Sequence, residues 1–130
     1  METLGKHLII DLWQVRENLT FNKNLVDDLI YLLKDLDQTI LDWVIHEFKN
    51  DAYTLVFLLG ESHLSIHTWP ESNYVALDFF TCNPATDMEK AKEKFVNFFK
   101  ARVDHNCFME RGKGLHEGMK SKMSYMDINT

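Results

Sequence analysis

The feature that most restricts the fold is the order in which two hydrophobic periods follow each other along the chain. Apolar residues that alternate with polar ones, or that form short continuous runs, predict β-strands at residues 7–15, 39–48, 53–59, 64–69, 74–80 and 103–110. Apolar residues at intervals of three and four predict amphipathic helices at residues 21–37 and 86–102. This order favours an α+β fold, a two-layer sandwich with helices packed on one face of a mostly antiparallel sheet.

Both helices begin near residues that commonly cap helices. Asn22 or Asn24 is the expected N-cap of the first helix, since an asparagine side chain accepts a hydrogen bond from a first-turn amide. Thr86 and Glu89 have the spacing of a capping box. The second helix is therefore expected to begin beside Thr86.

Length and charge limit the classes of protein that fit this pattern. The chain has 130 residues, enough for one domain, which we assign to residues 1–110. That part carries 10 Lys and Arg against 18 Asp and Glu, a formal charge of −8. An acidic body argues against a nucleic-acid partner, because phosphate binding needs a basic face. Residues 111–130 carry 4 basic and 2 acidic residues and three glycines, and we expect a polar, basic, loosely ordered C-terminal tail.

Membrane and secretory signals are not apparent in the sequence. No apolar run approaches the roughly 18 residues that a membrane-spanning helix needs, and the first residues lack a signal-peptide pattern. The two cysteines, Cys82 and Cys107, are too few for a disulfide framework. We therefore expect a cytoplasmic protein that does not act at a membrane.

Polar and reactive side chains are concentrated in one part of the chain. Residues 61–71 (ESHLSIHTWPE) are followed by residues 79–82 (FFTC), between strongly apolar strands. Polar groups are costly to bury in such surroundings, so the cluster needs either hydrogen-bond partners or a chemical role. On a regular strand Ser62 and His67 point to opposite faces, so they meet only where the backbone is irregular. Gly60, just before this segment, permits a bulge or a tight turn.

Residue spacing alone leaves three interpretations of this cluster open. His63, His67 and Cys82 offer ligands for zinc, although no familiar zinc-binding spacing is present. Ser62 or Ser65 with a histidine base would suit a hydrolase, although the pattern G-x-S-x-G is absent. The simplest interpretation is a strand whose polar face is solvated or satisfied by the core.

A resemblance to a known family favours a different interpretation. Residues 61–71, residues 80–82 (FTC) and residues 4–8 (LGKHL) together resemble the prokaryotic type of S-adenosylmethionine decarboxylase proenzyme. The resemblance covers about residues 3–103 and leaves out the C-terminal tail. It implies a self-processing enzyme that decarboxylates S-adenosylmethionine for spermidine synthesis, and a homodimer of processed protomers. An uncovered face of the expected sheet makes dimerisation physically reasonable.

The resemblance also implies how the cofactor arises. Ser62 Oγ would attack the carbonyl of Glu61, and the resulting ester would eliminate, so that the chain divides into residues 1–61 and residues 62–130. Ser62 would become a pyruvoyl group, an electron sink joined to the substrate amine as a Schiff base. Neither a metal nor pyridoxal phosphate would be needed.

Five further residues match functional positions of that family. His67 matches the base of the elimination step, and Thr54 occupies a position where the family usually has a serine that supports ester formation. Cys82 matches the proton donor of decarboxylation. Phe48 matches the aromatic residue that stacks on adenine, and Glu71 matches the acid that binds the ribose hydroxyls.

Two other functions remain compatible with the sequence. A pyruvoyl enzyme that decarboxylates a plain amino acid, such as ornithine or arginine, would keep Ser62, His67 and Cys82 but would not need Phe48 and Glu71. An unprocessed homologue would act only as a binding subunit. The presence of Phe48 and Glu71 favours the nucleoside substrate.

Overall fold

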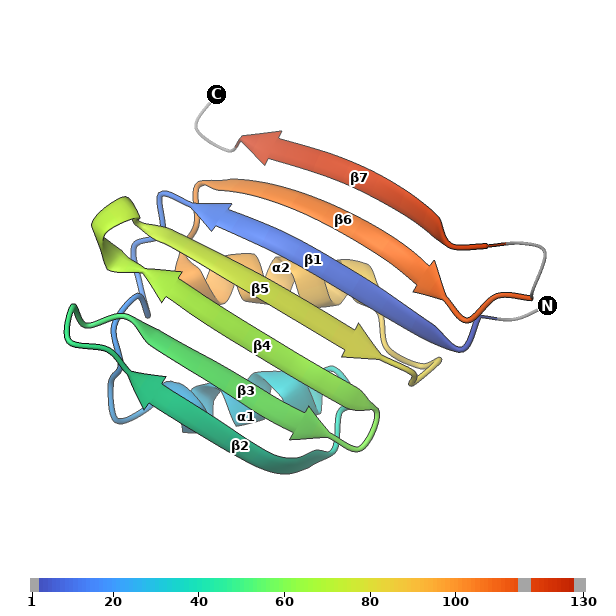
Figure 1. The fold of residues 1–130 in the computed structure, drawn as a ribbon, viewed down its shortest axis with the longest axis horizontal. Helices are drawn as coiled ribbons and strands as arrows, with labels where there is room; N and C mark the ends of the chain where they lie inside the picture. The colour runs from blue at the N-terminus through green and yellow to red at the C-terminus, as the bar shows by residue number, and fades with distance from the viewer. Residues whose placement is uncertain (1–2, 115–117, 128–130) are drawn as a thin grey trace.

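The computed structural model describes residues 3–114 and 118–127, and within them it forms one antiparallel sheet with two helices (Figure 1). The strand order is β2-β3-β4-β5-β1-β6-β7, and each neighbouring pair is antiparallel. The strands are β1 (Gly5–Trp13), β2 (Ile40–Glu47), β3 (Tyr53–Leu59), β4 (Ser62–Trp69), β5 (Tyr74–Thr81), β6 (Val103–Arg111) and β7 (Lys120–Asp127). The helices are α1 (Leu25–Asp35) and α2 (Met88–Phe99), and a short 3₁₀ turn, η1, spans Pro70–Ser72. The α+β prediction is confirmed.

The core lies between the sheet and the two helices, which both pack on the same face (Figure 1). In each central strand alternate residues are buried, as the period of a β-strand requires. Helix α2 contributes Phe95, whose ring packs edge-to-face on Phe79 of β5 with centroids 5.6 Å apart. Helix α1 contributes a stripe of leucines that includes Leu29 and Leu33. This one-sided core explains why the helices are amphipathic.

The opposite face of the sheet, which we call the outer face, is covered by neither described helix. It carries the alternate strand residues that are partly buried or exposed, many of them aromatic or ionisable. Trp13 and Tyr74 stack there with ring centroids 4.2 Å apart, and Trp69 lies 5.1 Å from the Tyr74 ring. The outer face therefore combines apolar surface with the polar residues that the sequence analysis singled out.

The start of helix α2 differs from the prediction. Asp87 is the N-cap, and its carboxylate accepts a hydrogen bond from the Lys90 amide at 3.1 Å. Thr86 is buried instead, and its hydroxyl donates to the Leu36 carbonyl at 3.2 Å. The expected capping box with Thr86 is therefore wrong. The Thr86 hydroxyl instead joins the segment before α2 to the segment that follows α1. Helix α1 begins after Asn24, one of the two expected caps, without a side-chain capping bond.

The C-terminal segment is also more regular than expected. Residues 120–127 form strand β7, which pairs with β6 along its length. The expectation of a loosely ordered tail is wrong for this segment, because the free edge of β6 supplies backbone hydrogen-bond partners that do not require an apolar sequence. Residues 115–117 and 128–130 lie outside the described part of the chain. None of the helices described is long and apolar enough to cross a membrane.

Candidate active site

Ser62 begins strand β4 directly after a two-residue turn, Gly60–Glu61, that joins it to β3. Its backbone has a φ of 156°, a value that L residues rarely adopt. Its hydroxyl oxygen lies 3.2 Å from Nδ1 of His63. Gly60 packs closely in this turn, since a Cβ added to it would lie 3.3 Å from Cβ of Thr39, a tight contact. Ser62 is thus partly exposed, and it has an unusual backbone conformation at the end of the turn.

Glu61 is held at both its carbonyl and its carboxylate. The carbonyl that Ser62 is expected to attack accepts a hydrogen bond from the amide of Cys82 at 2.9 Å. The carboxylate accepts two bonds from Thr39, from its amide at 2.8 Å and from its hydroxyl at 3.0 Å. An amide that donates to a carbonyl under attack stabilises the negative charge that develops on its oxygen. Glu61, Ser62 and Cys82 therefore form one group, which we call the Ser62 end of β4.

A second group lies at the other end of the same strand. An open cavity of about 320 Å³ is lined by Phe48, Thr54, His67 and Glu71, together with Asn50, Ala52, Thr68 and Trp69. Thr54 and His67 are cross-strand neighbours, and Oγ1 of Thr54 lies 3.0 Å from Nδ1 of His67. Phe48 is half-exposed and packs edge-to-face on the His46 ring, with centroids 4.6 Å apart. We call this group the His67 end of β4.

The two ends do not meet within the chain. Ser62 and His67 are five residues apart on β4, a separation of about 16 Å at the usual rise of a strand. The pairing of β4 with β3 and β5 continues without a register shift over this stretch. Leu64 and Ile66 are buried while His63 and His67 are not, so the expected alternation of faces is present. The backbone irregularity that would be needed to bring Ser62 to His67 is therefore absent between them within a single chain.

The imidazole beside Ser62 belongs to a small cluster on the outer face. The ring of His63 lies edge-on to His7, with centroids 6.3 Å apart, and to Phe80 at 5.8 Å. His7 Nε2 is 3.2 Å from Oδ1 of Asp78. Burial lowers the pKa of His7, and the opposing effect of Asp78 only partly offsets it. A neutral imidazole next to His63 avoids adding charge near Ser62.

The zinc interpretation is not supported by this geometry. His63 and His67 are four residues apart on a regular strand, about 13 Å, which exceeds the span of one metal ion. Within residues 3–114 and 118–127, no three His, Cys, Asp or Glu side chains are grouped to hold a metal.

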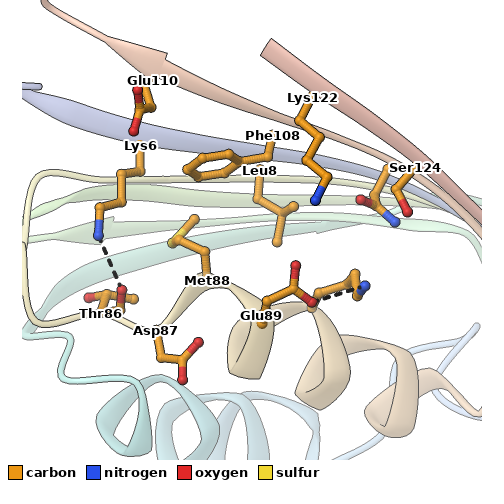
Figure 2. Close-up of a pocket in the computed structure, with 12 residues that line it drawn as sticks. Lys6, Leu8, Thr86, Asp87, Met88, Glu89, Phe108, Glu110, Lys122 and Ser124 are labelled. Carbon is orange, nitrogen blue, oxygen red and sulfur yellow. Dashed lines mark hydrogen bonds and ion pairs between the residues drawn. The ribbon is translucent and has the colours of Figure 1, made fainter. Parts of the chain in front are cut away.

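Another open cavity lies away from both groups, on the helix side of the sheet. Figure 2 shows it between β1, β6, β7 and the start of α2, with Leu8, Met88 and Phe108 around its apolar part. Its volume is about 490 Å³, and its lining includes none of the residues predicted for the site. Charged groups at its rim bond to the protein itself: Lys6 donates to the Thr86 carbonyl, and Lys92 pairs with Glu89. This cavity is therefore separate from the candidate active site.

Three contributors to the site were missed by sequence reasoning. The amide of Cys82 and the clamp by Thr39 leave no residue pattern, because a backbone contact or a single hydroxyl from a distant connection has no sequence signature. His63 could have been found, since it directly follows Ser62 in the polar segment.

A family model, named relatives and a solved structure all match this chain to the same family. The family model described as S-adenosylmethionine decarboxylase matches residues 6–112. The Archaeoglobus fulgidus protein named S-adenosylmethionine decarboxylase proenzyme is 34% identical over 110 residues, which cover 84% of this chain and 98% of that protein. The protein of the same name from Thermotoga maritima is 33% identical over 114 residues, 87% of this chain and 88% of that protein. The crystal structure of the adenosylmethionine decarboxylase from Aquifex aeolicus superposes with a TM-score of 0.72 at 28% identity, and the match covers 91% of this chain and 98% of that one.

Proposed function

The chain belongs to the S-adenosylmethionine decarboxylase family, and from this premise we propose that it is a self-processing, pyruvoyl-dependent enzyme that decarboxylates S-adenosylmethionine. The observation that carries the proposal is the Glu61–Ser62 peptide at the end of the turn, where the carbonyl to be attacked accepts a hydrogen bond from the Cys82 amide at 2.9 Å. The nucleophile, the carbonyl and a donor for the developing charge are the parts that an intramolecular acyl shift needs.

The residues at the turn fit the formation of a pyruvoyl group. Ser62 Oγ attacks the carbonyl carbon of Glu61 and gives its proton to an imidazole, for which His63 Nδ1 is 3.2 Å away. The C–N bond then breaks as the nitrogen gains a proton, which leaves an ester on Ser62 Oγ and a free amine. A base removes the Cα proton, the Cβ–O bond breaks, and Glu61 leaves as a carboxylate. Addition of water and loss of ammonia complete the conversion of residue 62.

The remaining residues of both groups serve the substrate. The pyruvoyl group supplies the electron sink for decarboxylation. Cys82 is exposed at the Ser62 end, where its thiol is available to return a proton to the substrate α-carbon. Phe48 is suited to stack on adenine and to face the cationic sulfonium, and Glu71 is suited to accept bonds from the ribose hydroxyls. A plain amino acid would need neither of these two side chains, so the shared cavity supports the nucleoside substrate.

The separation of the two groups supports a site that is shared between two copies of the chain. Consider a two-fold dimer in which the outer faces of two copies pack together. If the two-fold axis lies between the two sheets, above Ser65 and perpendicular to β4, the β4 strands of the two copies run in opposite directions. The Ser62 end of one copy then lies over the His67 end of the other. The partner's His67 would then be the base of the elimination step at residue 62, a role that the chain's own His67, about 16 Å away along β4, cannot fill.

The surface chemistry of the outer face is consistent with such a dimer. Several of its large apolar side chains are between 36% and 79% exposed: Trp13, Val44, Leu58, Trp69 and Met123. Among them Trp13 and Trp69 both pack on the Tyr74 ring, and this exposed aromatic cluster supports an interaction surface on the outer face. We assign the enzyme to the cytoplasm, because Cys82 and Cys107 are both free thiols, as a reducing compartment maintains them.

Intact mass and a denaturing gel test the proposal. The purified chain is expected to yield fragments of residues 1–61 and 62–130, the second with a pyruvoyl N-terminus, whereas the Ser62→Ala chain stays whole. Carbon dioxide release is expected from S-adenosylmethionine and not from ornithine or arginine. A wild-type chain that remains uncleaved through purification would contradict the proposal.

A further inference from the structure

We propose that Thr39 is a positioning residue for self-cleavage, and that it acts through the side chain of Glu61 to hold the scissile peptide where Ser62 attacks. The inference rests on the proposed self-processing of the Glu61–Ser62 bond. No residue of the connection between α1 and β2 was expected at the site from the sequence, so this assigns a role to a separate part of the chain.

Three hydrogen bonds fasten the turn to Thr39. The amide and hydroxyl of Thr39 donate to the two carboxylate oxygens of Glu61 at 2.8 and 3.0 Å. The Thr39 carbonyl accepts the amide of Gly60 at 2.8 Å. Bonds to a charged acceptor are stronger than neutral ones, and two donors from one residue fix the direction of the carboxylate. The residue that contains the carbonyl under attack is thus bound by both its side chain and its neighbouring amide.

A buried polar network connects this clamp to the opposite side of the scissile peptide. Gln38, next to Thr39, donates to the Thr86 hydroxyl at 2.8 Å and accepts from the Thr81 hydroxyl at 3.1 Å. These three side chains are at most 5% exposed. Thr81 directly precedes Cys82, whose amide donates to the Glu61 carbonyl. Thr39 holds the Glu61 carboxylate and the Cys82 amide holds the Glu61 carbonyl, and the buried network joins the two segments that supply these contacts.

Stability alone does not account for the clamp. Thr39 is exposed and Glu61 is only half-buried, and polar contacts at such positions contribute little to the free energy of unfolding. Cleavage, in contrast, depends strongly on geometry, because the hydroxyl of Ser62 must approach the carbonyl carbon along a narrow range of directions. If the carboxylate were free, the two-residue turn would sample other orientations of that carbonyl. The clamp is thus expected to affect the acyl shift rather than folding.

The test follows the rate of chain cleavage after a pulse of cell-free synthesis of the full chain. Thr39→Val keeps the shape and the amide but removes the hydroxyl, and is expected to slow cleavage about tenfold, the effect of about 1.4 kcal/mol on a barrier. Thr39→Ser restores the hydroxyl and is expected to cleave at nearly the wild-type rate. Thr20→Val, a change at an exposed threonine in the loop before α1, is the matched control and is expected to have no effect.

Two further measurements separate positioning from a structural role. In a Glu61→Ala background Thr39→Val is expected to cause no additional slowing, because its target carboxylate is gone. Hydroxylamine, which cuts an accumulated ester, is expected to release no extra fragments from Thr39→Val, since the slow step precedes the ester. Thermal unfolding of uncleavable Ser62→Ala chains is expected to be the same with and without Thr39→Val.

The outcomes distinguish this inference from the proposed function. Wild-type cleavage together with an unchanged rate in Thr39→Val would overturn the role of Thr39 and leave self-processing intact. Restoration of cleavage by hydroxylamine, or equal slowing by Thr39→Val in the Glu61→Ala background, would also overturn it. A wild-type chain that does not cleave would overturn both.

Discussion

The two ends of strand β4 are built in different ways. At the Ser62 end, the Cys82 amide and Thr39, from separate connections, hold Glu61, and the cavity lined by Cys82 has a volume of only about 40 Å³. At the His67 end, side chains line an open cavity of about 320 Å³. The first arrangement suits a reaction of the chain on itself, which needs fixed geometry and no substrate. The second suits the binding of a small molecule, which needs space and a few polar groups.

This difference gives each end its own expected phenotype. Changes at the Ser62 end should alter processing or the chemical step, and changes in the lining of the cavity should alter the affinity for substrate. His7 lies beside His63 on the outer face near the Ser62 end, so the protonation of His7 should reflect the surroundings of that end.

Cys82→Ala is expected to have the largest effect that leaves processing intact. The amide of residue 82 remains, so cleavage at Glu61–Ser62 should proceed. The proton donor is lost, so the rate of decarboxylation should fall at least about 100-fold. Gels and carbon dioxide release measure the two steps separately. Decarboxylation at the wild-type rate would remove Cys82 from the chemical step, and failure to cleave would show that its thiol also serves processing.

Phe48→Ala is expected to have an intermediate effect. Loss of stacking and of the cation–π contact should raise KM for S-adenosylmethionine about tenfold while cleavage remains normal. Phe21→Ala offers a matched control, since Phe21 is a similarly exposed phenylalanine in the loop before α1. Steady-state kinetics of the processed proteins check the result. Equal KM values for both variants would exclude Phe48 from the substrate site.

Asp78→Asn is expected to have the smallest effect, a change in the pKa of His7. Burial lowers its pKa below 6.5, and Asp78 works in the opposite direction, so Asp78→Asn should lower the pKa further. Because the neutral form is favoured, the stabilisation that His7 provides is present above pH 6.5 and is lost as the pH falls through its folded pKa. NMR titration of uncleaved Ser62→Ala chains measures both values. A pKa at or above 6.5 would contradict this assignment.

Much of the fold could be predicted because it depends on local periodicity. Strand β4 alternates Leu64 and Ile66 with His63 and His67, and this pattern alone specifies which face is buried. The N-cap at Asp87 and the strand β7 could not be predicted in the same way. The first depends on a tertiary contact that uses the Thr86 hydroxyl, and the second depends on the free edge of β6.

The candidate site was predictable as a set of residues but not as an arrangement. The sequence places Ser62, His67 and Cys82 close together in number, and the resemblance assigns them roles. The register of β4 puts Cys82 beside Glu61 and leaves His67 at the far end. Register is set by pairing between strands. A list of matching residues therefore does not reveal that Ser62 and His67 lie far apart within one chain.

Complementation between two inactive chains tests the shared site most directly. Ser62→Ala cannot be cleaved but retains His67, and His67→Ala retains Ser62 but lacks the base. Each is expected to yield no pyruvoyl fragment alone. When the two are synthesised together and the mixed dimer is isolated with a tag on one chain, the His67→Ala chain is expected to be processed, as intact mass identifies. A mixed dimer in which the His67→Ala chain remains unprocessed would contradict the claim that the site is completed by the partner's His67.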